Sequence, residues 1–202
     1  EWEAPRAGII GDLARATHDA ADPWSRDEVV SILIQLLTAG NETTTSLIGS
    51  AVCVLAERPD VQATLRADLS RIPSFIEEVL RLESPFKGHF RVVREACVLG
   101  GVSLPAGARL LLLWGSANRD AGAFSAADEI DLERSNPKSH LAFSEGIHFC
   151  VGAPLARLEA RLTLETLLAR TRSIRLAEGA SVRHLPSVFV RRLAALEIAL
   201  TR

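Results

Sequence analysis

The sequence contains no methionine and no tyrosine, and only three cysteines occur in its 202 residues. Cys53, Cys97 and Cys150 are an odd number and lie far apart, which is a poor framework for disulfides and favours a reducing compartment. We therefore expect a cytoplasmic protein. Because the chain starts at Glu1 and has no methionine, we also expect that an N-terminal segment precedes it.

The sequence also lacks a strong net charge and a long apolar run. Its formal net charge is -2 at pH 7, so it has no basic field of the kind that binds nucleic acid, and we expect no nucleic-acid partner. A bilayer-spanning helix needs roughly 20 apolar residues. The apolar stretch 29–39 is interrupted by Gln35, and the stretch 110–114 is too short. We expect no membrane span in this segment.

The strongest predicted element is a long helix at 25–57. Ser25 and Glu28 fit a capping box, and Pro59 ends the helical pattern. The residues between Val29 and Leu37 are apolar nearly all round, which predicts a helix through the centre of a larger domain.

Shorter elements surround this helix. They are predicted as helices at 6–20, 60–69, 73–82 and 153–172, hairpin strands within 90–114, an irregular segment at 118–152, and strands within 186–200. The expected fold class is mainly α with small antiparallel β-sheets.

A cysteine bracketed by two glycines lies just before the helix at 153–172. The segment from Phe143 to Gly152 is Phe-Ser-Glu-Gly-Ile-His-Phe-Cys-Val-Gly. Gly146 and Gly152 allow backbone conformations closed to other residues, so that amides can approach a sulfur. Near a helix N-terminus, the dipole favours the thiolate of Cys150. The alternative is an ordinary buried cysteine.

With Leu155-Ala156-Arg157 after it, this segment resembles the haem-ligand signature of the cytochrome P450 family, Phe-x-x-Gly-x-His-x-Cys-x-Gly. Ser144 stands where many members have Gly. The resemblance implies that the cofactor is haem b (iron protoporphyrin IX) and that Cys150 is its thiolate ligand, which favours O–O cleavage. The resemblance further implies cofactor-binding roles for the residues Phe143, Gly146, Gly152 and His148, the last as a hydrogen-bond donor to a haem propionate.

A second unusual segment, Ala39-Gly40-Asn41-Glu42-Thr43-Thr44, lies within the long helix, although Gly and Thr are poor helix formers. One interpretation is a helix kink with threonines bonded back to carbonyls. The other comes from the resemblance. It implies an oxygen-activation groove with room beside Gly40, and with Glu42 and Thr43 delivering protons.

The same resemblance assigns two further sets of charged residues. Glu78 and Arg81 form a Glu-x-x-Arg pair, and with Arg134 they would build a buried structural triad beneath the haem loop. Taken alone, the pair could equally be an ordinary surface pair. Arg91 would contact a haem propionate, with Arg94 as the competing candidate.

Together these likenesses imply that residues 1–202 are the C-terminal haem-binding part of a single P450 domain resembling the soluble bacterial members. The implied activity inserts one oxygen atom from dioxygen into a small, largely apolar organic substrate. Electrons would come from NAD(P)H through a ferredoxin or other reductase. A peroxide-using haem-thiolate enzyme and a noncatalytic haem-binding sensor remain alternatives. The segments 86–89 and 187–189 and the helix near Leu36 would face the substrate.

Overall fold

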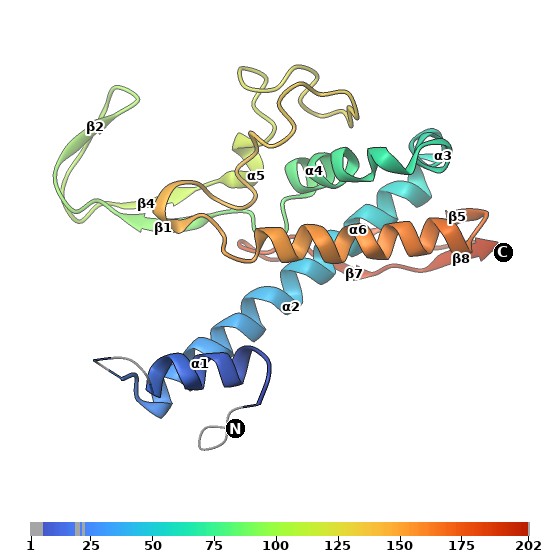
Figure 1. Cartoon of the computed structure of the whole chain (residues 1–202). Helices are drawn as coiled ribbons and strands as arrows, with labels where there is room; N and C mark the ends of the chain where they lie inside the picture. Colours follow the sequence, from blue (N-terminus) through green and yellow to red (C-terminus); the bar gives the residue numbers. More distant parts are fainter. Residues whose placement is uncertain (1–5, 19–20, 22, 202) are drawn as a thin grey trace. The chain divides into compact units, whose positions relative to one another are not determined.

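The computed structural model describes residues 6–18, 21 and 23–201 (Figure 1). The chain divides into two compact units, Glu1–Glu42 and Thr43–Arg202. The boundary falls inside the long helix α2 (Arg26–Glu57), which therefore contributes residues to both units.

The first unit contains α1 (Ile9–His18) and the N-terminal part of α2. The predicted capping box is confirmed, since the Ser25 amide donates to Glu28 Oε2 at 2.7 Å and the Glu28 amide donates to Ser25 Oγ at 3.3 Å. The Ser25 amide and the Ser25 hydroxyl both donate to the Glu28 carboxylate and lower the pKa of Glu28. The helix predicted at 6–20 begins later, at Ile9, while residues 19 and 20 lie outside the described part.

The two parts of α2 differ in burial. In the N-terminal part, where the sequence predicts a central helix, Ile34 is 60% exposed and Leu37 is 70% exposed. Beyond Thr43 the helix contributes side chains to the core of the second unit, and Leu47 and Leu55 are almost fully buried.

The second unit is built from helices and short strands. The helices are α3 (Pro59–Ala67), η1 (Leu69–Arg71), α4 (Ile72–Glu83), α5 (Trp114–Ala117), η2 (Gly146–His148) and α6 (Ala153–Arg170). The strands are β1 (His89–Val92), β2 (Cys97–Leu99), β3 (Val102–Leu104), β4 (Arg109–Leu112), β5 (Ser173–Leu176), β6 (Arg183–His184), β7 (Leu193–Ala195) and β8 (Ile198–Thr201).

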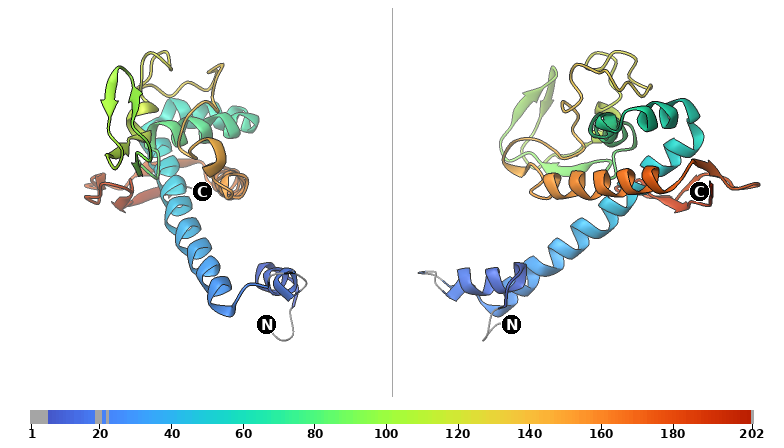
Figure 2. Two further views of the ribbon diagram at one scale, coloured as in Figure 1. Left: turned by 90° about the vertical axis from the view of Figure 1, so that its left-hand side faces the viewer. Right: turned by 45° about the vertical axis from the view of Figure 1, so that its right-hand side comes forward.

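One hydrophobic core holds this unit together. Figures 1 and 2 show α4 lying alongside α6, and the two helices are in contact. Phe75 and Ile76 of α4, Leu164 of α6 and Leu55 of α2 belong to the same buried cluster. Burying such side chains stabilises the fold by roughly 1.5–3 kcal/mol each. The core therefore fixes α4 against α6, the helix that follows the cysteine segment.

The strands form two-stranded antiparallel sheets, with pairs β1–β4, β2–β3, β5–β8 and β6–β7 among the described residues. The predicted hairpins within 90–114 are confirmed. Strand β5 was not predicted. Buried Gln62 fixes it, because its amide accepts from Ile174 N at 3.0 Å and donates to Ile174 O at 2.9 Å.

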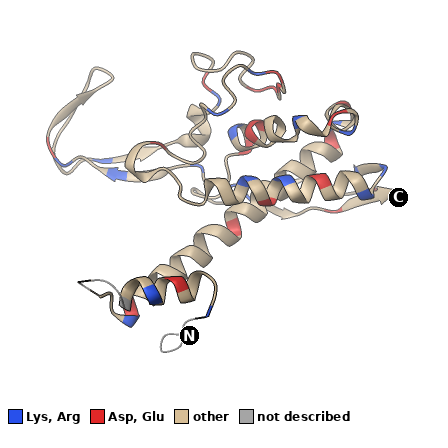
Figure 3. Ribbon diagram, viewed as in Figure 1, with Lys and Arg blue, Asp and Glu red and all other residues tan. Residues whose placement is uncertain are grey.

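Acidic and basic residues lie together on α4 and α6 (Figure 3). On α6 their signs alternate along the helix, whose opposite side contributes Ala160, Leu164 and Leu168 to the core. On α4 two glutamates and an arginine are buried, although such groups are rarely buried unless paired. We therefore expect the buried charged side chains of α4 to have partners of opposite charge.

Candidate functional site

The segment around Cys150 is a tight loop closed by its own backbone. The Cys150 amide donates to Phe143 O at 3.0 Å, and the Phe149 amide donates to Gly146 O at 3.0 Å. Gly146 has φ +75° and Ser144 has φ +62°, both in the left-handed region that favours glycine. The loop therefore has a defined shape before α6 begins.

The two glycines of the motif act differently from each other. Gly146 needs its freedom because of its positive φ. Gly152, the N-cap of α6, has φ -81°, so the predicted conformational reason does not apply to it. A Cβ added at Gly152 would instead lie 3.8 Å from Cys150 Sγ. Gly152 thus keeps side-chain atoms away from the sulfur.

The residues around the sulfur are apolar and exposed. Cys150 is itself exposed, Ile147 is 96% exposed and Val151 is 88% exposed. Exposed apolar side chains beside a cysteine sulfur suit contact with the flat face of a haem macrocycle, whose iron a cysteine sulfur can ligate. The residues present therefore fit a haem.

The candidate propionate ligands lie on separate elements. His148 is exposed in η2. Arg91 lies in β1, where its guanidinium donates to Phe90 O at 2.9 Å, and Arg94 is exposed just after this strand. A positive charge remains available on each arginine. Their assignment to propionates remains a prediction.

The segment with Gly40, Glu42 and Thr43 lies inside α2, which is helical throughout. Gly40 is exposed, and a Cβ built on it meets no atom within 4 Å. Glu42 and Thr43 are half-buried. Gly40 and Glu42 belong to the first unit and Thr43 to the second, so their proposed action at the cysteine loop stays a prediction.

Glu78, Arg81 and Arg134 are brought together in a buried ionic network. Glu78 accepts two bonds from Arg81, at 2.8 and 2.9 Å, and one from Arg134 at 2.9 Å. The Asp131 amide donates a fourth, also at 2.9 Å. Burial opposes ionisation, but the arginine bonds outweigh it and lower the pKa of Glu78. The pair is therefore not a surface pair.

The arginines of this network also bind backbone carbonyls of the irregular segment. Arg81 donates to Asn118 O at 3.0 Å and to Glu129 O at 2.8 Å. Arg134 donates to Ser125 O at 2.7 Å. The Phe124 ring lies beneath both guanidinium groups, 5.2 Å from Arg81 and 5.8 Å from Arg134. The network therefore holds the shape of a segment that has little secondary structure.

A second buried cluster was not predicted from the sequence. Glu77 Oε1 and Oε2 accept from Arg157 at 2.6 and 2.8 Å, and His140 Nε2 lies 3.0 Å from Oε2. Burial opposes ionisation of Glu77, but these bonds lower its pKa to about 2. No local sequence signal marks this cluster, because two adjacent helix residues about 100° apart can both lie on the solvent-facing side of a helix.

Asn118 connects the Glu78 network to the residues just before the cysteine segment. Its amide nitrogen donates to Ser84 Oγ at 2.9 Å, and its amide oxygen accepts from the Leu141 amide at 2.6 Å. Asn118 is 1% exposed. This residue is therefore a buried hub that joins the end of α4 to the start of the cysteine segment.

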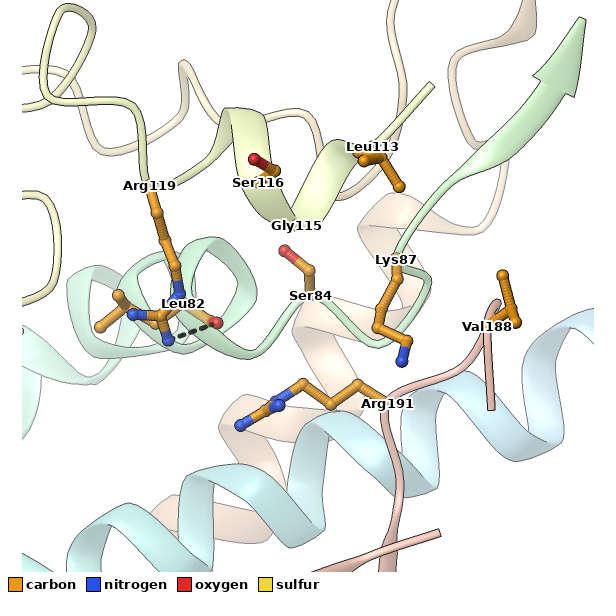
Figure 4. Close-up of a pocket in the computed structure, with 9 residues that line it drawn as sticks. All are labelled: Leu82, Ser84, Lys87, Leu113, Gly115, Ser116, Arg119, Val188 and Arg191. Atoms are coloured by element: carbon orange, nitrogen blue, oxygen red, sulfur yellow. Dashed lines mark hydrogen bonds between the residues drawn. The ribbon is translucent and has the colours of Figure 1, made fainter. Parts of the chain in front are cut away.

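Two of the segments predicted to face the substrate, 86–89 and 187–189, meet in the second unit, whereas Leu36 lies in the first. The Lys87 amide donates to Phe189 O at 2.6 Å, and Phe86 pairs with Val190 in a β-bridge. A cavity of about 300 Å³ lies beside them, with Lys87, Arg191 and Val188 among its lining residues (Figure 4). Arg191 and Arg119 both contact Glu83, which partly offsets their charge.

Among the described residues, no helix combines the length and the hydrophobicity that crossing a membrane requires.

Comparison with known proteins gives a consistent result. The family model described as Cytochrome P450 matches residues 9–176. Cytochrome P450 144 of Mycobacterium tuberculosis is 48% identical over 195 residues, which is 96% of this chain and 44% of that protein. The 6-deoxyerythronolide B hydroxylase of Saccharopolyspora erythraea is 38% identical, over 82% of this chain and 41% of that protein.

The solved structures that the chain resembles are also cytochromes P450. A substrate-free cytochrome P450 of Mycobacterium marinum has a TM-score of 0.92 at 37% identity, covering 98% of this chain and 51% of that one. A cytochrome P450 of Bacillus megaterium in complex with testosterone has a TM-score of 0.87 at 37% identity, covering 93% of this chain and 53% of that one. The chain spans less than half the length of the curated relatives that it matches.

The mainly helical fold with small antiparallel sheets, and with a cysteine loop ahead of α6, is the fold of the cytochrome P450 structures that the chain resembles. The predicted fold class is confirmed. The chain belongs to the cytochrome P450 family, as the family model and the bacterial relatives show.

Proposed function

We propose that residues 1–202 form the C-terminal haem-binding part of a single P450 domain, and that the intact protein is a haem-thiolate monooxygenase. It inserts one oxygen atom from dioxygen into an organic substrate. Two electrons come from NAD(P)H through a ferredoxin or other reductase. Relatives named as a hydroxylase and an epoxidase support this reaction type. The bacterial relatives and the three widely spaced cysteines support a cytoplasmic location.

The observation that carries the proposal is the loop that presents the exposed Cys150 just ahead of α6. Cys150 acts as the thiolate ligand, while Phe143, Gly146 and Gly152 shape the loop around it. His148 and Arg91 bind the propionates. When bound, haem b supplies the iron chemistry that activates dioxygen.

The remaining residues move protons and hold the substrate. Gly40 leaves space beside α2, and Glu42 and Thr43 pass protons from solvent toward the reacting oxygen. The substrate is small and largely apolar. It lies against the segments 86–89 and 187–189. Next to the first segment, the ring of Phe90 packs edge to face against that of Phe189, with 5.6 Å between the ring centroids.

The test is the absorbance of the reduced, carbon monoxide-saturated intact protein. We expect the red-shifted Soret band of thiolate-ligated haem in the wild type and in Cys97→Ser, a control at another exposed cysteine, and its loss in Cys150→Ser. Absence of the band from the wild type would refute the proposal. Turnover with reductase and dioxygen, compared with hydrogen peroxide alone, then distinguishes a monooxygenase from a peroxide-using enzyme.

A further inference from the structure

The carboxylate of Glu77 binds one residue on each side of the cysteine loop. His140 precedes the loop and Arg157 follows it in α6, while Glu77 lies in α4. The side chains of Glu77 and His140 are 5% and 1% exposed, and that of Arg157 is 26% exposed. A single buried carboxylate therefore links the two ends of the chain segment that contains Cys150.

The geometry of His140 defines which of its nitrogens donates. The Ala142 amide donates to His140 Nδ1 at 3.2 Å, so Nδ1 is an acceptor and the proton lies on Nε2. The Nε2–H then donates to Glu77 Oε2. Both ring nitrogens are thus used, and the ring cannot rotate without losing a buried hydrogen bond.

The contacts continue from the cluster to Cys150. The guanidinium carbon of Arg157 lies 4.5 Å from the centroid of the Phe143 ring, and Phe143 O accepts the amide of Cys150 at 3.0 Å. Phe143 therefore transmits the position of Arg157 to the backbone of Cys150. A cation over an aromatic face is most favourable where water is excluded.

We propose that Glu77, His140 and Arg157 form a clamp that positions the Cys150 loop for ligation of the haem iron. The clamp rests on the proposed function, because it sets the direction of the same sulfur. Its three members are positioning residues, since they act through Phe143 and the loop backbone. Glu78 binds other arginines and the segment 118–134, so the clamp can be removed separately from that network.

The test compares intact proteins that carry Glu77→Gln, Arg157→Lys or Glu165→Gln. Glu77→Gln keeps the shape of the side chain but removes its negative charge. Arg157→Lys keeps the positive charge but cannot form the bidentate contact with the Glu77 carboxylate. Glu165→Gln removes a carboxylate from an exposed pair on α6 and is the control. Two properties are measured: the Soret band of the reduced carbon monoxide complex, and amide hydrogen exchange of residues 141–152 in the haem-free protein.

We expect Glu77→Gln to bind haem but to shift a large part of the band from the thiolate to the neutral-thiol position. Exchange in 141–152 should accelerate at least about tenfold, as expected when one partner of a buried ion pair is removed. Arg157→Lys should lie between Glu77→Gln and the wild type. The control should match the wild type in both measurements.

Three outcomes would overturn the clamp: an unchanged band, unchanged exchange in 141–152, or exchange that accelerates equally throughout 43–201, which would mark a general stabilising role. A wild type without the thiolate band would instead refute the proposed function. In that case hydrogen exchange in the haem-free protein still decides whether Glu77 holds the loop.

Discussion

Glu77 and Glu78 are adjacent in α4, yet their carboxylates bind different arginines: Glu77 binds Arg157 of α6, and Glu78 binds Arg81 and Arg134. Successive helix positions differ in direction by about 100°, which separates the two carboxylates. One turn of α4 therefore supports both the cysteine loop and the irregular segment before it.

Removing the Glu78 charge should destabilise the protein severely. Glu78→Gln leaves two buried guanidinium groups without a counter-charge, and we expect a loss of about 3–5 kcal/mol in the free energy of unfolding. Urea unfolding followed by circular dichroism measures it. Glu133→Gln, in an exposed pair with Arg71, should change stability by less than about 1 kcal/mol. Equal effects of the two substitutions would contradict the network.

Glu77 should make stability dependent on pH in acid. Its pKa is about 2 in the folded protein, against an ordinary value of 4.5. Because the folded pKa is the lower one, its stabilisation is fully present above pH 4.5 and is lost as the pH falls toward 2. The stability difference between wild type and Glu77→Gln should therefore shrink from pH 6 to pH 3. Urea titrations at several pH values measure this, and a constant difference would contradict the assignment.

Ser144→Gly should stabilise the loop. Ser144 has φ +62°, where glycine avoids steric strain of roughly 1–2 kcal/mol but adds freedom to the unfolded chain. We expect a net gain of about 0.5–1 kcal/mol in thermal or urea unfolding. Ser139→Gly, at a nearby turn position without positive φ, is the matched control and should lower stability. A loss in Ser144→Gly would contradict the backbone conformation.

The three cysteines should differ in reactivity. Burial and the nearby Glu57 raise the pKa of the Cys53 thiol to about 12, whereas Cys97 and Cys150 are exposed. In haem-free native protein at pH 8, maleimide should label Cys97 and Cys150 rapidly and Cys53 only after unfolding. Peptide mass spectrometry identifies the labelled residues. Haem should protect Cys150 alone, and protection of Cys97 would argue against Cys150 as the ligand.

Thr43→Ala should separate haem binding from oxygen chemistry. If Thr43 delivers protons, the variant keeps the thiolate band, but most of the electrons from NAD(P)H reduce dioxygen to hydrogen peroxide instead of forming product. Thr38→Ala, which loses a bond to the Ile34 carbonyl on the same helix, is the control. The ratio of product to NAD(P)H consumed measures the effect. Tight coupling in Thr43→Ala would remove Thr43 from the mechanism.

Local sequence patterns predicted local structure well. The capping box of Ser25 and Glu28 has both of its hydrogen bonds, and the hairpin strands predicted within 90–114 include β2 and β3, joined at Gly100 and Gly101. These features depend on residues a few positions apart. The Glu78–Arg81–Arg134 network was found only because a family resemblance linked Arg134 to a motif far away in sequence.

Long-range contacts were harder to predict. Glu77, His140 and Arg157 are separated by long stretches of chain, and each has an ordinary local environment in the sequence. Strand β5 was missed for the same reason, since it depends on Gln62 and on pairing with β8. The apolar run near Ile34 predicted burial, but burial requires covering residues that a pattern within one helix cannot supply.

The irregular segment between α5 and the cysteine loop owes its shape to guanidinium groups that bind its carbonyl oxygens. Every residue type has a carbonyl, so these bonds do not depend on which side chains the segment carries. A mutational scan should therefore find most exposed positions in 119–133 tolerant of substitution, and Arg81 and Arg134 intolerant. Sequence variation can accumulate in this segment while its path stays the same.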